Sequence, residues 1–388
     1  MLHPDKALEI VYQIKSSSET DVIPINSGLG RIMPKPLISP EEYPPFAKSA
    51  MDGYAVQKED IRKKYRILET IAAGETPSQK ILPGTCSKIM TGAMIPEGAD
   101  KVIRVEFTEE KDGFMLLNTE EPYENIIRKG ENLKIGDPVL TPRILKPQDI
   151  GILAALGIAE IEVSLPPRIG IITTGSELVN PGGKLGPGQI FNSNGYQLMS
   201  QVTASACPCK YYGVIEDEPG HLDEIVGKAL DECDFLLLSG GVSMGEFDFV
   251  PKAVEKNGGE IRFHHLAIKP GKPTLFAQKG NKCIFGMPGN PVSTFIIFEI
   301  MVKPALYKWM GLQWKPQKFY GTLEKSFKRR DAARVEFRPV IYNGRTIITL
   351  KYHGSAHLNA LGDANALIRI EQGIKEIAEG TELDVRLI

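Results

Sequence analysis

Short apolar segments alternate with helical segments between Arg168 and Gly311, and this alternation constrains the fold more than any other feature of the chain. Four apolar runs have the length and composition of buried strands: Ile169–Thr173, Tyr211–Ile215, Phe235–Leu238 and Cys283–Phe285. Helical segments follow them at Gly195–Ala206, His221–Glu232, Phe249–Lys256 and Val292–Trp309. Such alternation predicts a multidomain α/β plus β protein whose α/β domain is a doubly wound, mostly parallel sheet with helices on both faces.

In sheets of this kind ligands bind beyond the carboxyl ends of the strands, so the loops that follow the four strands form the candidate site. The third loop contains Ser239, Gly240 and Gly241 and runs to Asp248. Glycine lets the backbone approach a phosphate closely, and the N–H groups at a helix start attract anions. A simple packing turn is the alternative interpretation of this loop, and the two interpretations stay open at this point.

The first two loops contain hydroxyl and acidic side chains. Thr174, Gly175 and Glu177 follow the first strand, and Asp217 follows the second. The hydroxyl and the glycine suit contacts with a phosphate or a pterin, and Glu177 adds a carboxylate. Asp217 and Asp248 each precede a helix, where an aspartate is also a typical N-cap, so a structural role is the alternative for both.

Two proline-stiffened loops complete the predicted site. Lys269 and Lys272 lie between prolines, which limit the entropy that the loop loses when it binds an anion. A solvated basic loop is the alternative for these lysines. Pro288 and Ser293 lie where the fourth strand ends and a helix begins, a position typical of oxyanion binding.

Carboxylates beside phosphate-binding loops indicate a hard divalent cation, most simply Mg²⁺, which we assign to Glu177, Asp217 and Asp248. The sequence has no histidine-rich set for zinc, no GxSxG nucleophile elbow and no Walker lysine motif. The residues therefore predict a Mg²⁺-dependent enzyme that acts on a phosphorylated or nucleotidyl small molecule.

At 388 residues the chain is too long for one ordinary core. The predicted domains are 1–53 with 137–167 (a discontinuous connector and dimerisation domain that includes a helix at 4–16), 54–136 (an inserted β domain), 168–314 (α/β) and 315–388 (a C-terminal β-barrel). Asn343-Gly344 is a strong hairpin signal in the last of these. Asp52 with Gly53 forms a turn that either enters a strand or presents Asp52 to a ligand.

Charge and apolar runs exclude several classes of protein. A formal net charge of −2 argues against a general nucleic-acid binder. No apolar run reaches the roughly 20 residues that span a bilayer, and the N-terminus lacks the apolar core of a signal peptide. The five cysteines lack metal-site spacing and suit a reducing compartment, so we expect a cytoplasmic location.

Six segments resemble the molybdopterin molybdenumtransferases, the MoeA family, which includes the E domain of gephyrin and of the plant molybdenum-insertion protein. The matching strings are PPFAKSAMDGYAV, MTGAMIPEGADKVI, TTGSEL, SGGVSMGEFDF, LAIKPGKP and GMPGNPVS. The resemblance implies that adenylated molybdopterin and molybdate bind, and that hydrolysis of the pyrophosphate bond leaves molybdenum cofactor and AMP. It also implies an elongated homodimer of four-domain chains, with the site between subunits and possible transient contact with the adenylyltransferase.

The same resemblance assigns residues to roles. Positions matching the family's acids are Asp52, Glu177, Asp217 and Asp248; those matching its lysines are Lys269 and Lys272; and Ser293 matches a serine expected near molybdate. The acids would position Mg²⁺ and its water, and the lysines would neutralise charge on the phosphates and hold molybdate.

Two positions depart from the family pattern. Asn132 stands where the family often has an aspartate, so the amide keeps an acceptor but loses the charge. His265 stands where a lysine or arginine often lines the oxyanion pocket, and it is charged only if a neighbouring anion raises its pKa. Both departures bear on molybdate affinity and on selectivity against tungstate.

Two rival functions remain. A molybdopterin adenylyltransferase would share the α/β domain, but its central loop is expected to read Thr-Gly-Gly-Thr-Gly rather than Gly-Gly-Val-Ser, and the Asp52 segment would be surplus. A non-catalytic, gephyrin-like scaffold is disfavoured because the acids and lysines are retained.

Overall fold

The computed structural model describes residues 1–388 except 217–218, 243–248 and 351–357. The chain divides into two compact units, of which the larger contains Met1–Ile23, Ser27–Pro34 and Ile161–Ile388 and the smaller Pro24–Asn26 and Lys35–Glu160. No helix within the described ranges is long and apolar enough to cross a membrane.

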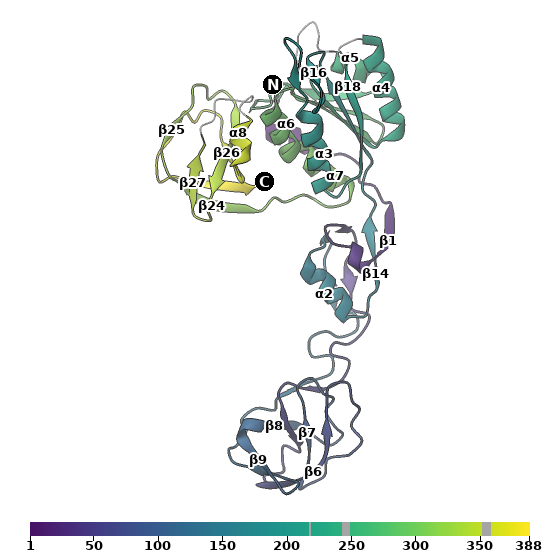
Figure 1. Cartoon of the computed structure of the whole chain (residues 1–388), viewed down its shortest axis with the longest axis vertical. Helices are drawn as coiled ribbons and strands as arrows, with labels where there is room; N and C mark the ends of the chain where they lie inside the picture. The colour runs from purple at the N-terminus through teal and green to yellow at the C-terminus, as the bar shows by residue number, and fades with distance from the viewer. Residues whose placement is uncertain (217–218, 243–248, 351–357) are drawn as a thin grey trace. The chain divides into compact units, whose positions relative to one another are not determined.

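A six-stranded sheet forms the centre of the α/β domain in the larger unit (Figure 1). Its order is β18 (Cys209–Ile215), β15 (Ile169–Thr174), β19 (Phe235–Ser239), β23 (Lys282–Met287), β22 (Leu275–Lys279) and β20 (Glu260–His264). The first four strands are parallel, and the register pairs Phe235 with Ile169 on one side and with Cys283 on the other. The predicted mostly parallel sheet is confirmed, and β22 and β20 extend it with antiparallel pairing.

Helices cover both faces of this sheet (Figure 1). They are α3 (Asn194–Ala204), α4 (Pro219–Glu232), α5 (Val250–Lys256), α6 (Pro291–Ile297) and α7 (Lys303–Trp309). On one face of the sheet, Leu236 of β19 packs in the same apolar cluster as Val226 of α4. On the other face, the Phe235 ring contacts the edge of the Trp309 ring, with 5.5 Å between the ring centroids. Burying each such side chain contributes about 1.5–3 kcal/mol, so β19 is held from both sides and its carboxyl end is a rigid support.

The long helix predicted over Val292–Trp309 is interrupted. A π-helical turn, η3 (Phe298–Val302), separates α6 from α7, and Pro304 lies in the first turn of α7. Proline lacks an N–H and its ring clashes with the carbonyl four residues earlier, so a regular helix cannot run through this position.

The C-terminal region contains the predicted β-barrel. Its five strands close in the order β26 (Val335–Tyr342), β27 (Thr346–Thr349), β24 (Lys318–Leu323), β30 (Glu382–Leu387) and β28 (Ala366–Ile370), which pairs again with β26. Asn343-Gly344 forms the predicted hairpin, in which Tyr342 pairs with Ile347 and Gly344 has φ +95°. Closure pairs each of these five strands on both sides.

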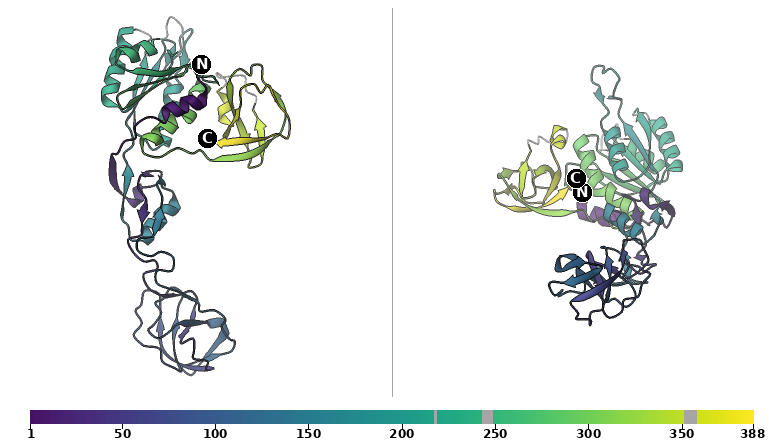
Figure 2. Two further views of the ribbon diagram at one scale, coloured as in Figure 1. Left: turned by 180° about the vertical axis from the view of Figure 1, so that it is seen from behind. Right: turned by 60° about the horizontal axis from the view of Figure 1, so that its bottom comes forward.

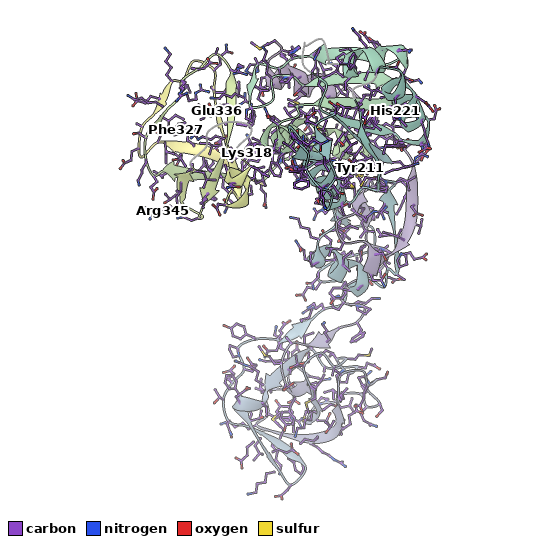
Figure 3. The ribbon with its side chains drawn as sticks, turned by 45° about the horizontal axis from the view of Figure 1, so that its top comes forward. Tyr211, His221, Lys318, Phe327, Glu336 and Arg345 are labelled. Carbon is purple, nitrogen blue, oxygen red and sulfur yellow. The ribbon has the colours of Figure 1, made fainter. Side chains whose placement is uncertain are left out.

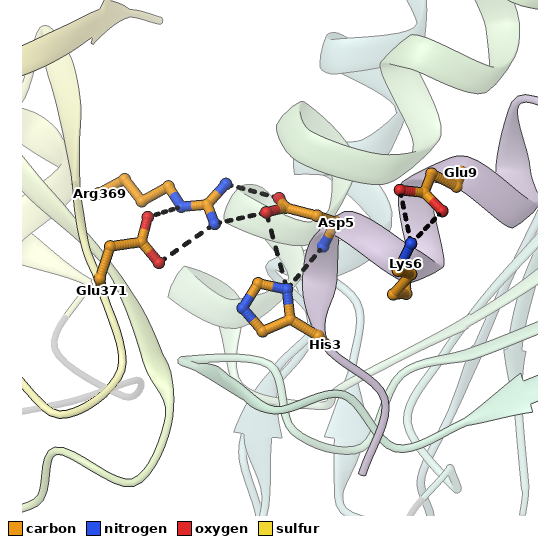
Figure 4. A network of polar contacts seen from close by, with 6 residues as sticks. All are labelled: His3, Asp5, Lys6, Glu9, Arg369 and Glu371. Atoms are coloured by element: carbon orange, nitrogen blue, oxygen red, sulfur yellow. Dashed lines mark hydrogen bonds and ion pairs between the residues drawn. The ribbon is translucent and has the colours of Figure 1, made fainter.

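The N-terminal helix α1 (Pro4–Val11) is shorter than predicted and ends at Val11 rather than near residue 16. Asp5 accepts two hydrogen bonds from Arg369 of the barrel, at 2.6 and 2.8 Å, as Figure 4 shows. Tyr12 donates to the carbonyl of Trp314 at 3.2 Å. Helix α1 lies beside the barrel (Figure 2), within the larger unit.

The smaller unit contains a six-stranded sheet of order β8-β5-β7-β6-β10-β9. These strands are β5 (Gly53–Val56), β6 (Lys64–Ile71), β7 (Thr85–Ile89), β8 (Lys101–Arg104), β9 (Thr108–Lys111) and β10 (Phe114–Leu117). Helix α2 (Pro147–Ala155) begins at a proline, and Gly157 follows its end with φ +72°, the arrangement that helix termini favour.

Candidate functional site

A cavity of about 720 Å³ opens at the carboxyl ends of β15, β19 and β23. Its wall comes from the loops after these strands, from the start of α3, and from a ribbon of β16 (Leu178–Val179) and β17 (Ile190–Phe191). The predicted site residues that line it are Thr174, Gly175, Glu177, Ser239, Gly240, Gly241 and Pro288. Three of the predicted loops therefore meet at one cavity.

The loop after β15 presents a carboxylate at the cavity wall. Thr174 is buried, and its hydroxyl oxygen has no hydrogen-bond partner among the described residues. Gly175 has φ +148°, and its N–H donates to the carbonyl of Ile215 at 3.2 Å. The turn leaves Glu177 exposed, and an exposed carboxylate beside a cavity is available to a cation or to water.

The loop after β19 is tightly packed. Ser239 is buried, and its hydroxyl accepts a hydrogen bond from the Asn194 amide at 2.8 Å. Gly240 has φ +98° and lies so close to Thr174 that a Cβ atom there would overlap the Thr174 carbonyl oxygen. The Gly240 N–H donates to the carbonyl of Met287 at 3.1 Å, so this amide holds the neighbouring strand end and is not free for an anion.

The loop after β23 separates the two residues that were predicted there. Pro288 lines the cavity, and its carbonyl accepts hydrogen bonds from Thr294 at 2.5 Å and from Ser239 at 3.3 Å. Ser293 lies in the first turn of α6 and is buried, but it is not part of the cavity wall.

Asn194, the first residue of α3, joins two of these loops and was not predicted. Its side-chain amide donates to the Ser239 hydroxyl at 2.8 Å and to the Gly289 carbonyl at 2.7 Å. Its amide oxygen is buried and has no partner among the described residues. One side chain therefore fixes the relative position of two loops and leaves an acceptor unused.

Asn192 is also a cavity residue that the sequence analysis missed. Its buried amide donates to the hydroxyl of Tyr211 at 2.6 Å, and Tyr211 lies on β18 (Figure 3). The signal was present, because Asn192, Ser193 and Asn194 stand immediately before the helix predicted from Gly195. Polar residues at that point are typical of helix N-termini, where they also meet ligands.

Lys269 is directed to the barrel. It lies on β21 (Ile268–Lys269), which pairs in parallel with β26, and its ammonium group lies 3.6 Å from the Glu336 carboxylate. Glu336, labelled in Figure 3, is buried and also lies 3.3 Å from Arg338 and 3.7 Å from Arg329. Lys269 is not among the residues that line the cavity.

His265 and Lys272 lie together, outside the cavity wall. The His265 ring stacks on His264 at 4.0 Å, and burial, followed by the charges of His264 and Lys272, lowers the pKa of His265. A lowered pKa favours the neutral form of His265 near pH 7. Lys272 is exposed next to Pro273, which lines the cavity, and His264 Nε2 lies 2.7 Å from the carbonyl of the cavity residue Val242.

Asp52 lies in the smaller unit and is exposed. The backbone N–H of Thr91 and its hydroxyl donate to the Asp52 carboxylate at 2.6 and 2.8 Å, and these two bonds lower the pKa of Asp52. The carboxylate is thereby oriented and kept ionised.

Asn132, the other departure from the family pattern besides His265, is exposed, and its backbone N–H donates to the carbonyl of Tyr43 at 3.1 Å.

Of the three predicted metal ligands, only Glu177 belongs to the described residues. Asp217 and Asp248 lie outside the described residues, and within the described ranges no three His, Cys, Asp or Glu side chains form a possible metal-binding group. Glu177 and the hydroxyls and amides of the described cavity wall are oxygen donors, with no thiol or imidazole among them. This donor chemistry fits a hard cation such as Mg²⁺ rather than zinc.

Three sequence families match successive parts of the chain. Residues 2–157 match "MoeA N-terminal region (domain I and II)", residues 170–308 match "Probable molybdopterin binding domain", and residues 322–388 match "MoeA C-terminal region (domain IV)".

Full-length relatives and solved structures agree with these matches. The chain is 31% identical to a molybdopterin molybdenumtransferase of Bacillus subtilis (strain 168), over 99% of this chain and 93% of that protein. It is 33% identical to one of Haemophilus influenzae, over 99% of this chain and 98% of that protein. The crystal structure of the molybdopterin biosynthesis moeA protein from Pyrococcus horikoshii OT3 superposes with a TM-score of 0.87 at 30% identity and covers 100% of both chains.

Proposed function

The chain belongs to the family of molybdopterin molybdenumtransferases, enzymes of molybdenum cofactor biosynthesis, and from that premise we propose the reaction that it catalyses. Molybdate is inserted into adenylated molybdopterin, the phosphoanhydride is hydrolysed in a Mg²⁺-dependent step, and molybdenum cofactor and AMP are released. The single observation that carries this proposal is the cavity at the carboxyl ends of β15, β19 and β23, which is lined by seven of the predicted site residues.

The cavity wall suits a substrate with a charged centre. Gly175 and Gly240 have no side chain, so the backbone at these positions can approach a ligand closely. The buried hydroxyl of Ser239 is already oriented by its hydrogen bond from Asn194. Groups fixed before the substrate binds need not be reoriented when charge develops during the reaction.

In this proposal Glu177 holds Mg²⁺ together with Asp217 and Asp248. When bound, the ion would neutralise phosphate charge and lower the pKa of a bound water. The chain's own contribution is to keep the Glu177 carboxylate accessible at the cavity wall.

Lys269 and Lys272 are proposed to bind the oxyanions of the substrate and of molybdate. Lys269 lies beside the buried Glu336, so its ammonium group has a fixed place and a partner in the absence of substrate. Lys272 is exposed next to a cavity residue. Pro288, Ser293 and His265 complete the proposed set of substrate-binding residues.

We further propose a cytoplasmic homodimer in which the partner subunit's Asp52 completes the site. The ionised state and fixed orientation of this chain's Asp52 support that role. Docking with the adenylyltransferase that makes the intermediate would be transient. Tungstate is an alternative substrate to molybdate, because the same oxyanion contacts serve both.

The test is release of AMP and molybdenum cofactor from adenylated molybdopterin and molybdate, with and without Mg²⁺. We expect turnover that depends on Mg²⁺ and that falls roughly a hundredfold in Glu177→Gln, since the amide loses the charge that the cation needs. Glu260→Gln is the matched control, because Glu260 is an exposed glutamate on β20 that does not line the cavity. ATP consumption with bare molybdopterin, without AMP release from the adenylated form, would favour the adenylyltransferase instead.

A further inference from the structure

Three large apolar side chains of the cavity wall are exposed. Ile190 is 55% exposed, Phe191 47% and Leu358 44%. Leaving such side chains in water forgoes the favourable free energy of burying them, and exposed apolar groups that line one cavity mark a contact surface. We call these three residues the apolar rim.

The apolar rim is fixed to the same backbone as the polar residues of the site. The Ile190 N–H donates to the Glu177 carbonyl at 2.9 Å, and the Asn192 N–H donates to the Val179 carbonyl at 2.8 Å. Phe191 therefore stands between two backbone hydrogen bonds of the β16–β17 ribbon, where its main chain is held in place. On a fixed main chain only the Phe191 side chain has to be ordered when it meets a ligand, which lowers the entropic cost of binding.

The rest of the cavity wall contains small and polar residues, in contrast to the apolar rim. Thr174, Ser239, Gly240 and Asn194 line the same cavity, and the Asn194 amide oxygen is buried without a partner among the described residues. One cavity thus combines an exposed apolar surface with a hydrogen-bonding surface. A ligand that fills it needs a flat apolar part joined to a strongly polar part.

We propose that the apolar rim holds a flat heteroaromatic ring of the substrate, stacked on Phe191, while the attached phosphate lies toward the small and polar wall. The inference rests on the proposed function, whose substrate carries two such rings, a pterin and an adenine, on one phosphoanhydride. Both rings have the chemistry that stacks on phenylalanine, so binding experiments with each half distinguish them.

The experiment measures the Kd of the full chain for two probes, 6-hydroxymethylpterin phosphate by its fluorescence and AMP by calorimetry. Phe191→Ala should raise the Kd of at least one probe roughly tenfold to a hundredfold, the range of alanine substitutions at stacking residues. Phe191→Tyr keeps the ring and should stay within about threefold of the wild type. The control is Phe319→Ala, because Phe319 is another exposed phenylalanine, on β24 and away from this cavity.

Weakened binding of the pterin probe alone assigns the apolar rim to the pterin, and weakened binding of AMP alone assigns it to the adenine. If both weaken and Phe191→Tyr restores both, the rim accepts either ring and the inference stands. Unchanged affinities in Phe191→Ala, equal losses in Phe191→Tyr, or no binding of either probe to the wild type would overturn it. Because binding is measured without turnover, a chain that binds the probes but releases no AMP contradicts only the proposed function.

Discussion

Gly240 is the residue on which the cavity wall is most tightly built. It combines φ +98° with a contact in which a Cβ atom would overlap the Thr174 carbonyl oxygen. We predict that Gly240→Ala displaces the loop, costs about 1–3 kcal/mol of stability in backbone strain alone and abolishes AMP release. The measurements are urea unfolding and steady-state turnover.

Gly344→Ala is the matched control for that prediction. Gly344 has a similar φ of +95°, but among the described residues no atom beyond its own chain neighbours lies within 4 Å of the added Cβ, and it is part of the barrel hairpin. Gly344→Ala should lower the stability through backbone strain but leave AMP release unchanged. Normal turnover in Gly240→Ala would mean that the packing of this loop against Thr174 does not shape the site.

His265 gives a prediction about pH. Burial, His264 and Lys272 lower its pKa below the ordinary 6.5, so between these two pKa values the unfolded chain binds more protons than the folded chain. The contribution of His265 to stability is therefore present above pH 6.5 and is lost as the pH falls through the folded-state pKa. Wild type should lose more thermal stability than His265→Gln between pH 7.5 and pH 5.

The control for the pH prediction is His221→Gln, because His221 is exposed on α4 (Figure 3). This variant should follow the wild type across the same pH range. If His265→Gln also follows the wild type, the pKa of His265 is not lowered by its surroundings. An oxyanion bound nearby should oppose the shift, so added molybdate is expected to reduce the pH dependence.

At the scale of elements, strand β5 depends on a glycine at its start. A Cβ atom on Gly53 would overlap the carbonyl oxygen of Ile103 in β8, the neighbouring strand. Gly53→Ala should therefore destabilise the β domain by about 1–3 kcal/mol in urea unfolding and disturb Asp52 beside it.

Gly151→Ala provides the opposite case. Gly151 lies inside α2, and outside that helix's own backbone no atom of the described part of the chain lies within 4 Å of an added Cβ, so alanine should raise stability by about 0.5–1 kcal/mol. A neutral Gly53→Ala would show that β5 and β8 can separate without loss, against the close pairing seen in the structure.

The elements that could be predicted from the sequence are those with a strong local signal. The run Phe235–Leu238 is apolar throughout because both faces of β19 are covered, and Asn343-Gly344 specifies its hairpin locally. Strands β20 and β22 were missed, since Glu260–His264 mixes charged and apolar residues at a sheet edge. The break at η3 depends on Pro304, and the regular spacing of apolar residues from which the helix was predicted does not reveal such a break.

The site divides in the same way. Strand ends and glycine-rich loops could be located because their geometry follows from the parallel sheet, and Thr174, Gly175, Ser239 and Gly240 do line one cavity. The place of Lys269 could not be predicted, because it depends on pairing between β21 and the barrel, a contact between distant parts of the sequence.

At the scale of the molecule, the proposed homodimer can be tested by complementation. If the partner subunit's Asp52 completes each site, Asp52→Asn and Glu177→Gln homodimers should both be inactive. After random reassortment of the two variants, half of the dimers are mixed and each has one intact site, so about a quarter of wild-type activity should return. Activity that stays at the level of the separate variants would place the whole site within one chain.

The most direct measurement is a crystal structure of the chain with adenylated molybdopterin and molybdate, with anomalous diffraction data at the molybdenum edge. The account predicts an anomalous peak and phosphate density in the cavity lined by Thr174, Glu177, Ser239 and Gly240. A chain that turns over in solution but binds molybdenum and nucleotide away from these residues would contradict it.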